Sequence, residues 1–185
     1  MAVRNVAVIV GSLRKASFSR HCALALMKLA PETLKLGFVE IGDLALYNQD
    51  LDTDTRPEPW TRFRDAIRPC DGVLFVTPEY NRSVPGVLKN AIDVGSRPYG
   101  QSVWSKKPAA VVSTSPGALG GFGANQHLRQ SFVFLDMPVL QQPEAYIGRA
   151  SSLFTEDGEV TDDGSKRFLA GFMTTFAAWI EQVGG

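Results

Sequence analysis

Short runs of apolar residues alternate along the chain with longer segments in which apolar residues recur every three or four positions. The first run, residues 6–10, is nearly continuous in β-branched residues and ends at Gly11, which is typical of a strand covered on both faces. The segment from Ser17 to Ala30 has apolar residues at helical spacing and stops at Pro31. The pattern therefore predicts a strand followed by a helix.

The same alternation continues to the end of the chain. Further strands are expected at residues 35–41, 72–76, 109–113 and 138–141. Further helices are expected from Trp60 to Ile67, from Val87 to Val94, through Leu128, Phe132 and Leu135, and from Asp162 to Val183. The stretch from Gly42 to Pro59 is rich in Asp, Thr and Pro, which predicts a long surface connection. No repeat or break divides the pattern, so residues 1–185 are expected to form one domain.

Five strand–helix units of similar spacing predict an α/β fold, a five-stranded parallel sheet with helices on both faces. The most hydrophobic strand, 72–76, should be central, and the flavodoxin-like strand order 2-1-3-4-5 is the natural arrangement. Ligands of such sheets bind beyond the carboxyl ends of the strands, between the first and third. The polar and glycine-rich loops fall there, at residues 11–19, 78–86 and 115–123. We therefore expect the functional site at this edge.

Composition excludes several classes of function. The chain is 44% hydrophobic and 21% charged, as in an ordinary globular domain, and its 19 Lys and Arg residues balance 19 Asp and Glu residues. A neutral chain gives no reason to expect nucleic acid or an anionic membrane as partner. Cys22 and Cys70 lack C-x-x-C spacing and only two histidines are present, so neither a zinc site nor a disulfide framework is expected. Without a signal-peptide core or an apolar run of about 20 residues, the expectation is a cytoplasmic protein.

The first loop carries the strongest indication of a bound anion. Its polar and flanking residues are Ser12, Leu13, Arg14, Ser17, Phe18 and Ser19. Free backbone N–H groups at the start of the helix attract anions, and a guanidinium adds a charge-assisted hydrogen bond, so the loop suits a phosphate monoester. It has neither the Gly-Lys-Ser/Thr of nucleotide triphosphate loops nor the three glycines of the dinucleotide motif. Alternatively, Ser17 or Ser19 only caps the helix and Arg14 is solvated.

The second and third loops are suited to a flat ligand. The second offers Pro78, Glu79, Tyr80 and Asn81, which combine an aromatic face with polar groups. The third offers Ser115 and Gly117, where glycine lets the main chain approach a ligand closely. The alternatives are a turn in which Pro78 and Asn81 serve only backbone geometry, and an ordinary flexible connection.

These residues resemble the NAD(P)H-dependent FMN reductases, in particular the branch of chromate, quinone and azo-dye reductases. The motifs that carry the resemblance are Gly11-Ser-Leu-Arg14, Ser17-Phe-Ser19, Thr77-Pro-Glu-Tyr-Asn81, Ser83-Val-Pro-Gly86 and Leu88-Lys-Asn-Ala-Ile-Asp93. It extends from Val6 to about Gly148 and so covers most of the chain.

The resemblance implies FMN bound without a covalent link, its phosphate on the first loop and its ring against residues 78–81, with Ser115 and Gly117 on the other flank. It implies ping-pong transfer of electrons from NADPH or NADH to small-molecule acceptors, namely quinones, flavins, azo compounds or chromate-like oxyanions. Because the flavin supplies the chemistry, no catalytic side chain and no metal is expected. The resemblance also implies a homodimer or homotetramer.

Two other interpretations stay open at this point. A flavodoxin-like electron carrier would bind the same cofactor, although such carriers are usually strongly acidic and this chain is neutral. An FMN-binding regulatory protein without turnover would differ only in failing to oxidise NAD(P)H in the presence of a quinone. Arg82 could attract an anionic acceptor or the 2′-phosphate of NADPH, or it could simply be solvated.

Overall fold

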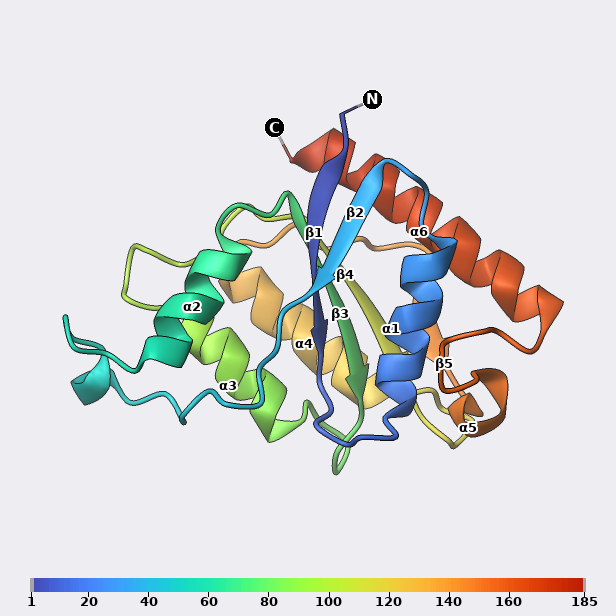
Figure 1. Ribbon diagram of the computed structural model, residues 1–185, viewed down its shortest axis with the longest axis horizontal. Helices are drawn as coiled ribbons and strands as arrows, with labels where there is room; N and C mark the ends of the chain where they lie inside the picture. The colour runs from blue at the N-terminus through green and yellow to red at the C-terminus, as the bar shows by residue number, and fades with distance from the viewer. Residues whose placement is uncertain (1, 185) are drawn as a thin grey trace.

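The computed structural model describes residues 2–184 and contains one sheet of five parallel strands (Figure 1). The strands are β1 (Arg4–Val10), β2 (Leu34–Phe38), β3 (Gly72–Pro78), β4 (Ala109–Thr114) and β5 (Ala145–Ile147). Their order is β2-β1-β3-β4-β5, with parallel pairing throughout. The predicted flavodoxin-like order and the central position of the third strand are therefore confirmed.

Helices cover both faces of the sheet, and Figure 1 shows the two layers on either side of the strands. The helices are α1 (Phe18–Leu29), α2 (Glu58–Ile67), α3 (Gly86–Gly95), α4 (Phe122–Phe134), the short α5 (Ala150–Leu153), α6 (Asp163–Val183) and one 3-10 turn, η1 (Gln49–Leu51). Helices α1, α5 and α6 lie on one face, and α2, α3 and α4 lie on the other. Among residues 2–184, no helix is both long and apolar enough to cross a membrane.

Alternation along the central strand builds two hydrophobic cores. The side chains of Val73 and Phe75 on β3 pack among those of α2, α3 and α4, whereas those of Leu74 and Val76 pack among those of α1 and α6. All four are completely buried. A strand buried on both faces carries apolar residues at every position, which is why the continuous run 72–76 identifies it.

The predicted strand at residues 138–141 is wrong, because the fifth strand is Ala145–Ile147. Val139 forms only an isolated bridge with Ala109, and the N–H of Leu140 donates to the carbonyl of Ala109 at 2.8 Å. The segment therefore touches the start of β4 and then leaves it. Pro143 has no N–H to donate, and pairing resumes two residues later beside Val112–Thr114. The second strand also ends earlier than predicted, at Phe38.

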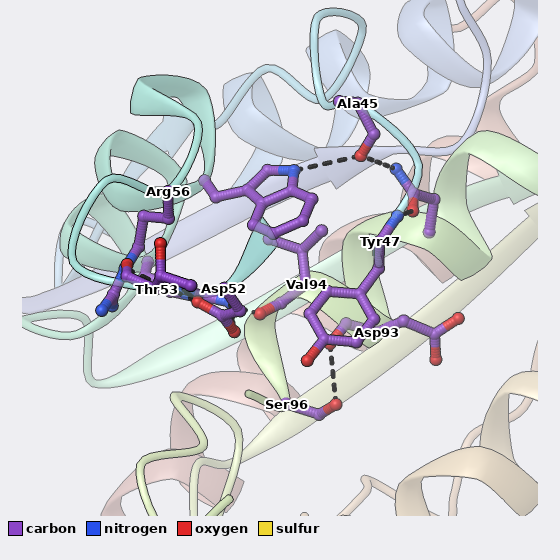
Figure 2. A network of polar contacts seen from close by, with 11 residues as sticks. Ala45, Tyr47, Asp52, Thr53, Arg56, Asp93, Val94 and Ser96 are labelled. Carbon is purple, nitrogen blue, oxygen red and sulfur yellow. Dashed lines mark hydrogen bonds and ion pairs between the residues drawn. The ribbon is translucent and has the colours of Figure 1, made fainter. Parts of the chain in front are cut away.

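A buried ion pair anchors the long connection between β2 and α2. The carboxylate of Asp52 accepts two hydrogen bonds from Arg64, at 2.8 and 3.0 Å, and each side chain is only 3% exposed. The Nε of Arg64 also donates to the carbonyl of Val94 at the end of α3, at 2.9 Å. Figure 2 shows Tyr47 and Asp52 of this connection close to Val94 of α3. The predicted surface connection is thus fastened to α2 and α3 instead of lying loosely over them.

We predict that Asp52→Ala lowers the free energy of unfolding by about 3 kcal/mol or more, because a buried guanidinium loses its partner. Urea denaturation followed by circular dichroism measures the change. Asp50→Ala is the matched control, since Asp50 lies in the 3-10 turn directly before Asp52 but is exposed, and it should cost less than about 0.5 kcal/mol. Equal losses in the two variants would contradict an anchoring role for the pair.

Candidate functional site

The loops after β1, β3 and β4 meet at one edge of the sheet, as expected. The register pairs Val10 with Val76 and Pro78 with Thr114, so β3 and β4 end at the same level and β1 ends two residues earlier. A pocket of about 130 Å³ lies between the loops. Its lining residues are Ser12, Arg14, Ser17, Phe18, Ser19, Pro78, Glu79, Tyr80, Thr114, Ser115 and Pro116.

The first loop leaves β1 through a close contact with β3. The N–H of Gly11 donates to the carbonyl of Val76 at 2.9 Å, and a Cβ at Gly11 would lie 2.8 Å from the hydroxyl oxygen of Thr77. No side chain fits at that distance, which explains the glycine. At the far end of the loop, Ser17 caps α1 by accepting from the N–H of Arg20 at 3.3 Å. The alternative role predicted for Ser17, a helix cap, is therefore present.

A buried hydroxyl pair joins the first loop to β4. The hydroxyls of Ser19 and Thr114 are 2.7 Å apart, and both residues are almost fully buried. Ser19 does not cap the helix, because the capping oxygen belongs to Ser17. This bond fixes the first turn of α1 relative to the end of β4.

Arg14 supplies the free positive charge of the pocket. Its guanidinium carbon lies 5.7 Å from the centre of the Phe18 ring, and within residues 2–184 it forms no ion pair. The neighbouring Arg20 is committed elsewhere, because it pairs with Glu40 at 3.0 Å and stacks on Phe38. An unpaired guanidinium beside the amino terminus of α1 attracts an anion such as a phosphate.

The second loop ends in a tight turn beside the pocket. Tyr80 and Ser83 exchange both backbone hydrogen bonds at 3.0 Å, and Asn81 and Arg82 between them have φ values of 51° and 63°. Two consecutive left-handed residues are the geometry of a type I′ turn. Tyr80 leaves an aromatic ring partly exposed at the pocket.

The third loop is held by backbone contacts with β5 and the residues after it. The N–H of Ser115 donates to the carbonyl of Ile147 at 2.9 Å, and its hydroxyl accepts from the N–H of Gly117 at 3.1 Å. Gly120 has a φ of 60°, and a Cβ there would lie 2.4 Å from the carbonyl carbon of Tyr146. The loop is therefore shaped by close main-chain packing and is not a flexible connection.

The pocket contains most, but not all, of the residues that the sequence singled out. Leu13, Asn81 and Gly117 lie outside the lining, and Leu13 instead leans toward Gly42. The lining also includes Thr114 and Pro116, which the sequence analysis did not name. Their position in the sequence could have identified them, because both are adjacent to Ser115 and directly follow the predicted fourth strand.

The two thiols lie away from the pocket. Cys22 is completely buried in the core beneath α1, and burial raises the pKa of its thiol. Cys70 is half-buried three residues after the end of α2, and burial also raises the pKa of its thiol. Neither group is therefore poised as a thiolate nucleophile. Within residues 2–184, no group of three or more His, Cys, Asp or Glu side chains is arranged to hold a metal ion.

A larger hollow of about 610 Å³ lies between β2 and α6, near the amino-terminal ends of the strands. Its lining is mainly apolar, and the charged groups at its margin, Arg4 and Glu181, are paired with each other at 2.7 Å. It lacks the convergent polar groups that orient a small ligand. The smaller pocket at the opposite edge therefore remains the candidate site.

Known proteins share this arrangement. Residues 4–152 match the family described as NADPH-dependent FMN reductase. The chain belongs to that family. This FMN reductase family member is 64% identical to a quinone reductase of Pseudomonas putida over 179 residues, which cover 97% of the chain and 96% of the relative. It is 48% identical to a 2-hydroxy-1,4-benzoquinone reductase of a Burkholderia species over 176 residues, which cover 95% of the chain and 96% of the relative.

A solved structure shares the whole fold. FerB, described as a flavoenzyme NAD(P)H:(acceptor) oxidoreductase from Paracoccus denitrificans, superposes with a TM-score of 0.92 at 46% identity. The match covers 98% of this chain and 99% of FerB. The family resemblance inferred from the loop motifs is thereby confirmed.

We predict that Ser19→Ala destabilises this FMN reductase family member by about 1–3 kcal/mol, because the buried hydroxyl of Thr114 loses its partner. Adding Thr114→Val should recover much of the loss, since removing both polar groups leaves neither unsatisfied. Urea denaturation of the ligand-free single and double variants measures the coupling. Strictly additive losses would show that the two hydroxyls do not act as a pair.

Proposed function

We propose that the protein is an NAD(P)H-dependent FMN reductase that passes electrons from NADPH or NADH to quinones. The observation that carries the proposal is the pocket where Arg14, a helix amino terminus and an aromatic side chain converge at the switch point of the sheet. Family membership and the names of the relatives support the same conclusion.

The donor set of the pocket fits FMN. Arg14, the hydroxyl of Ser12 and the backbone N–H groups of Phe18 and Ser19 at the start of α1 would hold the phosphate, while Ser17 caps the helix beside it. Leu13 would add backbone contact on the outer side of the first loop.

The flat ring system would be held by the other two loops. Pro78 and Tyr80 offer the ring apolar and aromatic surface. The main chain of Glu79 and of Asn81 would border the ring beside them. Ser115 and Gly117 would border it from the third loop. The small volume of the pocket, about 130 Å³, suits the phosphate end, and an open ring face leaves room for a second molecule.

Bound FMN supplies the redox chemistry, accepting a hydride from NAD(P)H and returning electrons to an acceptor. The protein's own residues bind and orient, and no side chain needs to act as acid, base or nucleophile. Arg14 neutralises the phosphate, and Tyr80 shapes the surface on which nicotinamide and acceptor bind in turn. Sharing one surface in this way results in ping-pong kinetics.

Charge at the mouth of the pocket favours an uncharged acceptor. Arg82, a cation within the second loop, pairs with Glu79 at 3.2 Å and so is not free to attract an anion. Arg14 is assigned to the phosphate. This distribution supports quinones over oxyanions such as chromate, while azo compounds and free flavins stay predictions of the family resemblance.

The proposal includes a homodimer or homotetramer. Val133 and Phe134 near the end of α4 are 81% and 83% exposed, and apolar side chains adjacent in this way are typical of a surface covered by another subunit. Sedimentation equilibrium measures the mass in solution.

The test of the function is a visible spectrum of the protein after reconstitution with FMN and desalting, repeated without oxygen after adding NADPH or NADH. Retained flavin absorbance that bleaches, and returns when a benzoquinone is added, is the expected result. Retained flavin that does not bleach would favour an electron carrier or a regulatory FMN-binding protein. No retained flavin would overturn the assignment of the loops.

We predict that Arg14→Ala weakens FMN binding by about 1.5–3 kcal/mol, the usual loss for a hydrogen bond to a charged group. Titration of the apoprotein with FMN, followed by quenching of flavin fluorescence, gives the Kd. Lys15→Ala is the matched control, because it removes the same charge from the next residue, which is exposed and does not line the pocket. Equal affinities for the two variants would remove Arg14 from the phosphate site.

A further inference from the structure

The side chain of Glu79 points away from solvent and toward another helix. This side chain is only 11% exposed although the residue lines the pocket. One oxygen accepts from the N–H of Ala124 in the first turn of α4 at 3.2 Å, and the other accepts from Arg82 at 3.2 Å. A side chain that the family resemblance assigns to the flavin is therefore engaged by the protein itself.

Helix α4 has no cap of its own at this end. Its N-cap residue is Gly121, which has no side chain to accept a hydrogen bond, and its first turn contains no acidic residue. The N–H of Ala124 is one of the donors left over at any helix start. Glu79, 45 residues earlier in the chain, supplies both the missing acceptor and the negative charge that a helix amino terminus favours.

The turn beyond Glu79 is strained and is held against the same helix. Asn81 and Arg82 are both left-handed, and arginine lacks the freedom of the glycine usual at the second of these positions. A Cβ at Gly123 would lie 2.8 Å from the carbonyl oxygen of Arg82 and 2.9 Å from the Glu79 carboxylate. A further hydrogen bond of 2.9 Å joins the hydroxyl of Ser83 and Nδ1 of His127. The turn is thus clamped on α4 over a full helical turn.

We propose that Glu79 is a positioning residue of the reaction. Its carboxylate fixes the second loop to α4, and its charge, balanced by Arg82 and the helix terminus, sets the electrostatic potential at the flavin pocket. The part of this inference that concerns the flavin rests on the proposed function. The clamp itself is a property of the ligand-free protein and can be tested there.

Hydrogen exchange in the apoprotein tests the clamp. In Glu79→Ala, backbone amides of residues 79–83 and 122–126 should exchange about tenfold faster than in the wild type, because local opening no longer breaks a charged hydrogen bond. Gly123→Ala should accelerate the same amides by forcing the turn off the helix, and it provides a second route if Glu79→Ala does not fold. Unchanged exchange in either folded variant would overturn the clamp.

The ratio of the Kd values for oxidised and reduced FMN tests whether the charge of Glu79 sets the electrostatic potential at the flavin pocket. Reduced FMN carries more negative charge, so Glu79→Gln, which leaves Arg82 and the α4 terminus unbalanced, should favour the reduced form by about threefold or more. Arg82→Gln should shift the ratio the opposite way, and by less, because Arg82 is 75% exposed and screened by solvent. The double variant should return toward the wild-type ratio.

Glu181→Gln is the matched control, since it breaks an ion pair with Arg4 at the start of β1, the end of the strand far from the pocket, and should leave the ratio unchanged. If the role of Glu79 is purely structural, Glu79→Gln and Arg82→Gln should shift the ratio of Kd values in the same direction. That outcome would overturn the proposal that the charge of Glu79 acts on the flavin pocket. Failure of the wild type to bind FMN would overturn the proposed function together with this part. The exchange experiment would still decide the clamp.

Discussion

The parallel register of β1, β3 and β4 is the constraint on which the site depends. It aligns Val10 with Val76 and Pro78 with Thr114, so three loops far apart in sequence begin within two residues of one another along the strand direction. Two contacts at the pocket then join different loops or the helices that follow them: the Ser19–Thr114 hydroxyl pair and the bond from Ala124 to Glu79. The Ser19–Thr114 hydroxyl pair joins the first to the third. If one strand slipped by one residue in this register, its buried side chains would turn to the wrong face of the sheet. The residues that now contact one another across the loops would also move apart.

The fold could be predicted where burial leaves a periodic or continuous apolar signal. Residues 72–76 are apolar because helices cover both faces of β3, and the four-residue spacing of Phe172, Phe176 and Ile180 reflects the buried stripe of α6. The fifth strand could not be found in this way. Ala145–Ile147 has three residues, too few for a period, and the apolar segment before it competes for the same assignment. Only the tertiary pairing with Val112–Thr114 distinguishes the two.

The site could be predicted in outline because Ser, Arg and Gly residues stand where parallel strands end. The partners of individual polar groups could not. Nothing in the local sequence indicates that Asp52, within a stretch of surface composition, accepts two hydrogen bonds from the buried Arg64. Likewise, Glu79 belongs to a motif that suggests ligand contact, yet its carboxylate caps a helix that begins 43 residues later, at Phe122. Such pairs depend on how helices pack, which local patterns do not encode.

The amino termini of α1 and α4 both face this edge of the sheet, and the protein treats them differently. At α1, Ser17 satisfies the N–H of Arg20, while the amides of Phe18 and Ser19 take part in no hydrogen bond among residues 2–184, and Arg14 stands beside them. At α4, the carboxylate of Glu79 occupies the equivalent position. An exogenous anion is therefore attracted to one terminus and repelled from the other. This asymmetry would direct a phosphate to the first loop and leave the second and third loops to the uncharged, planar part of a ligand.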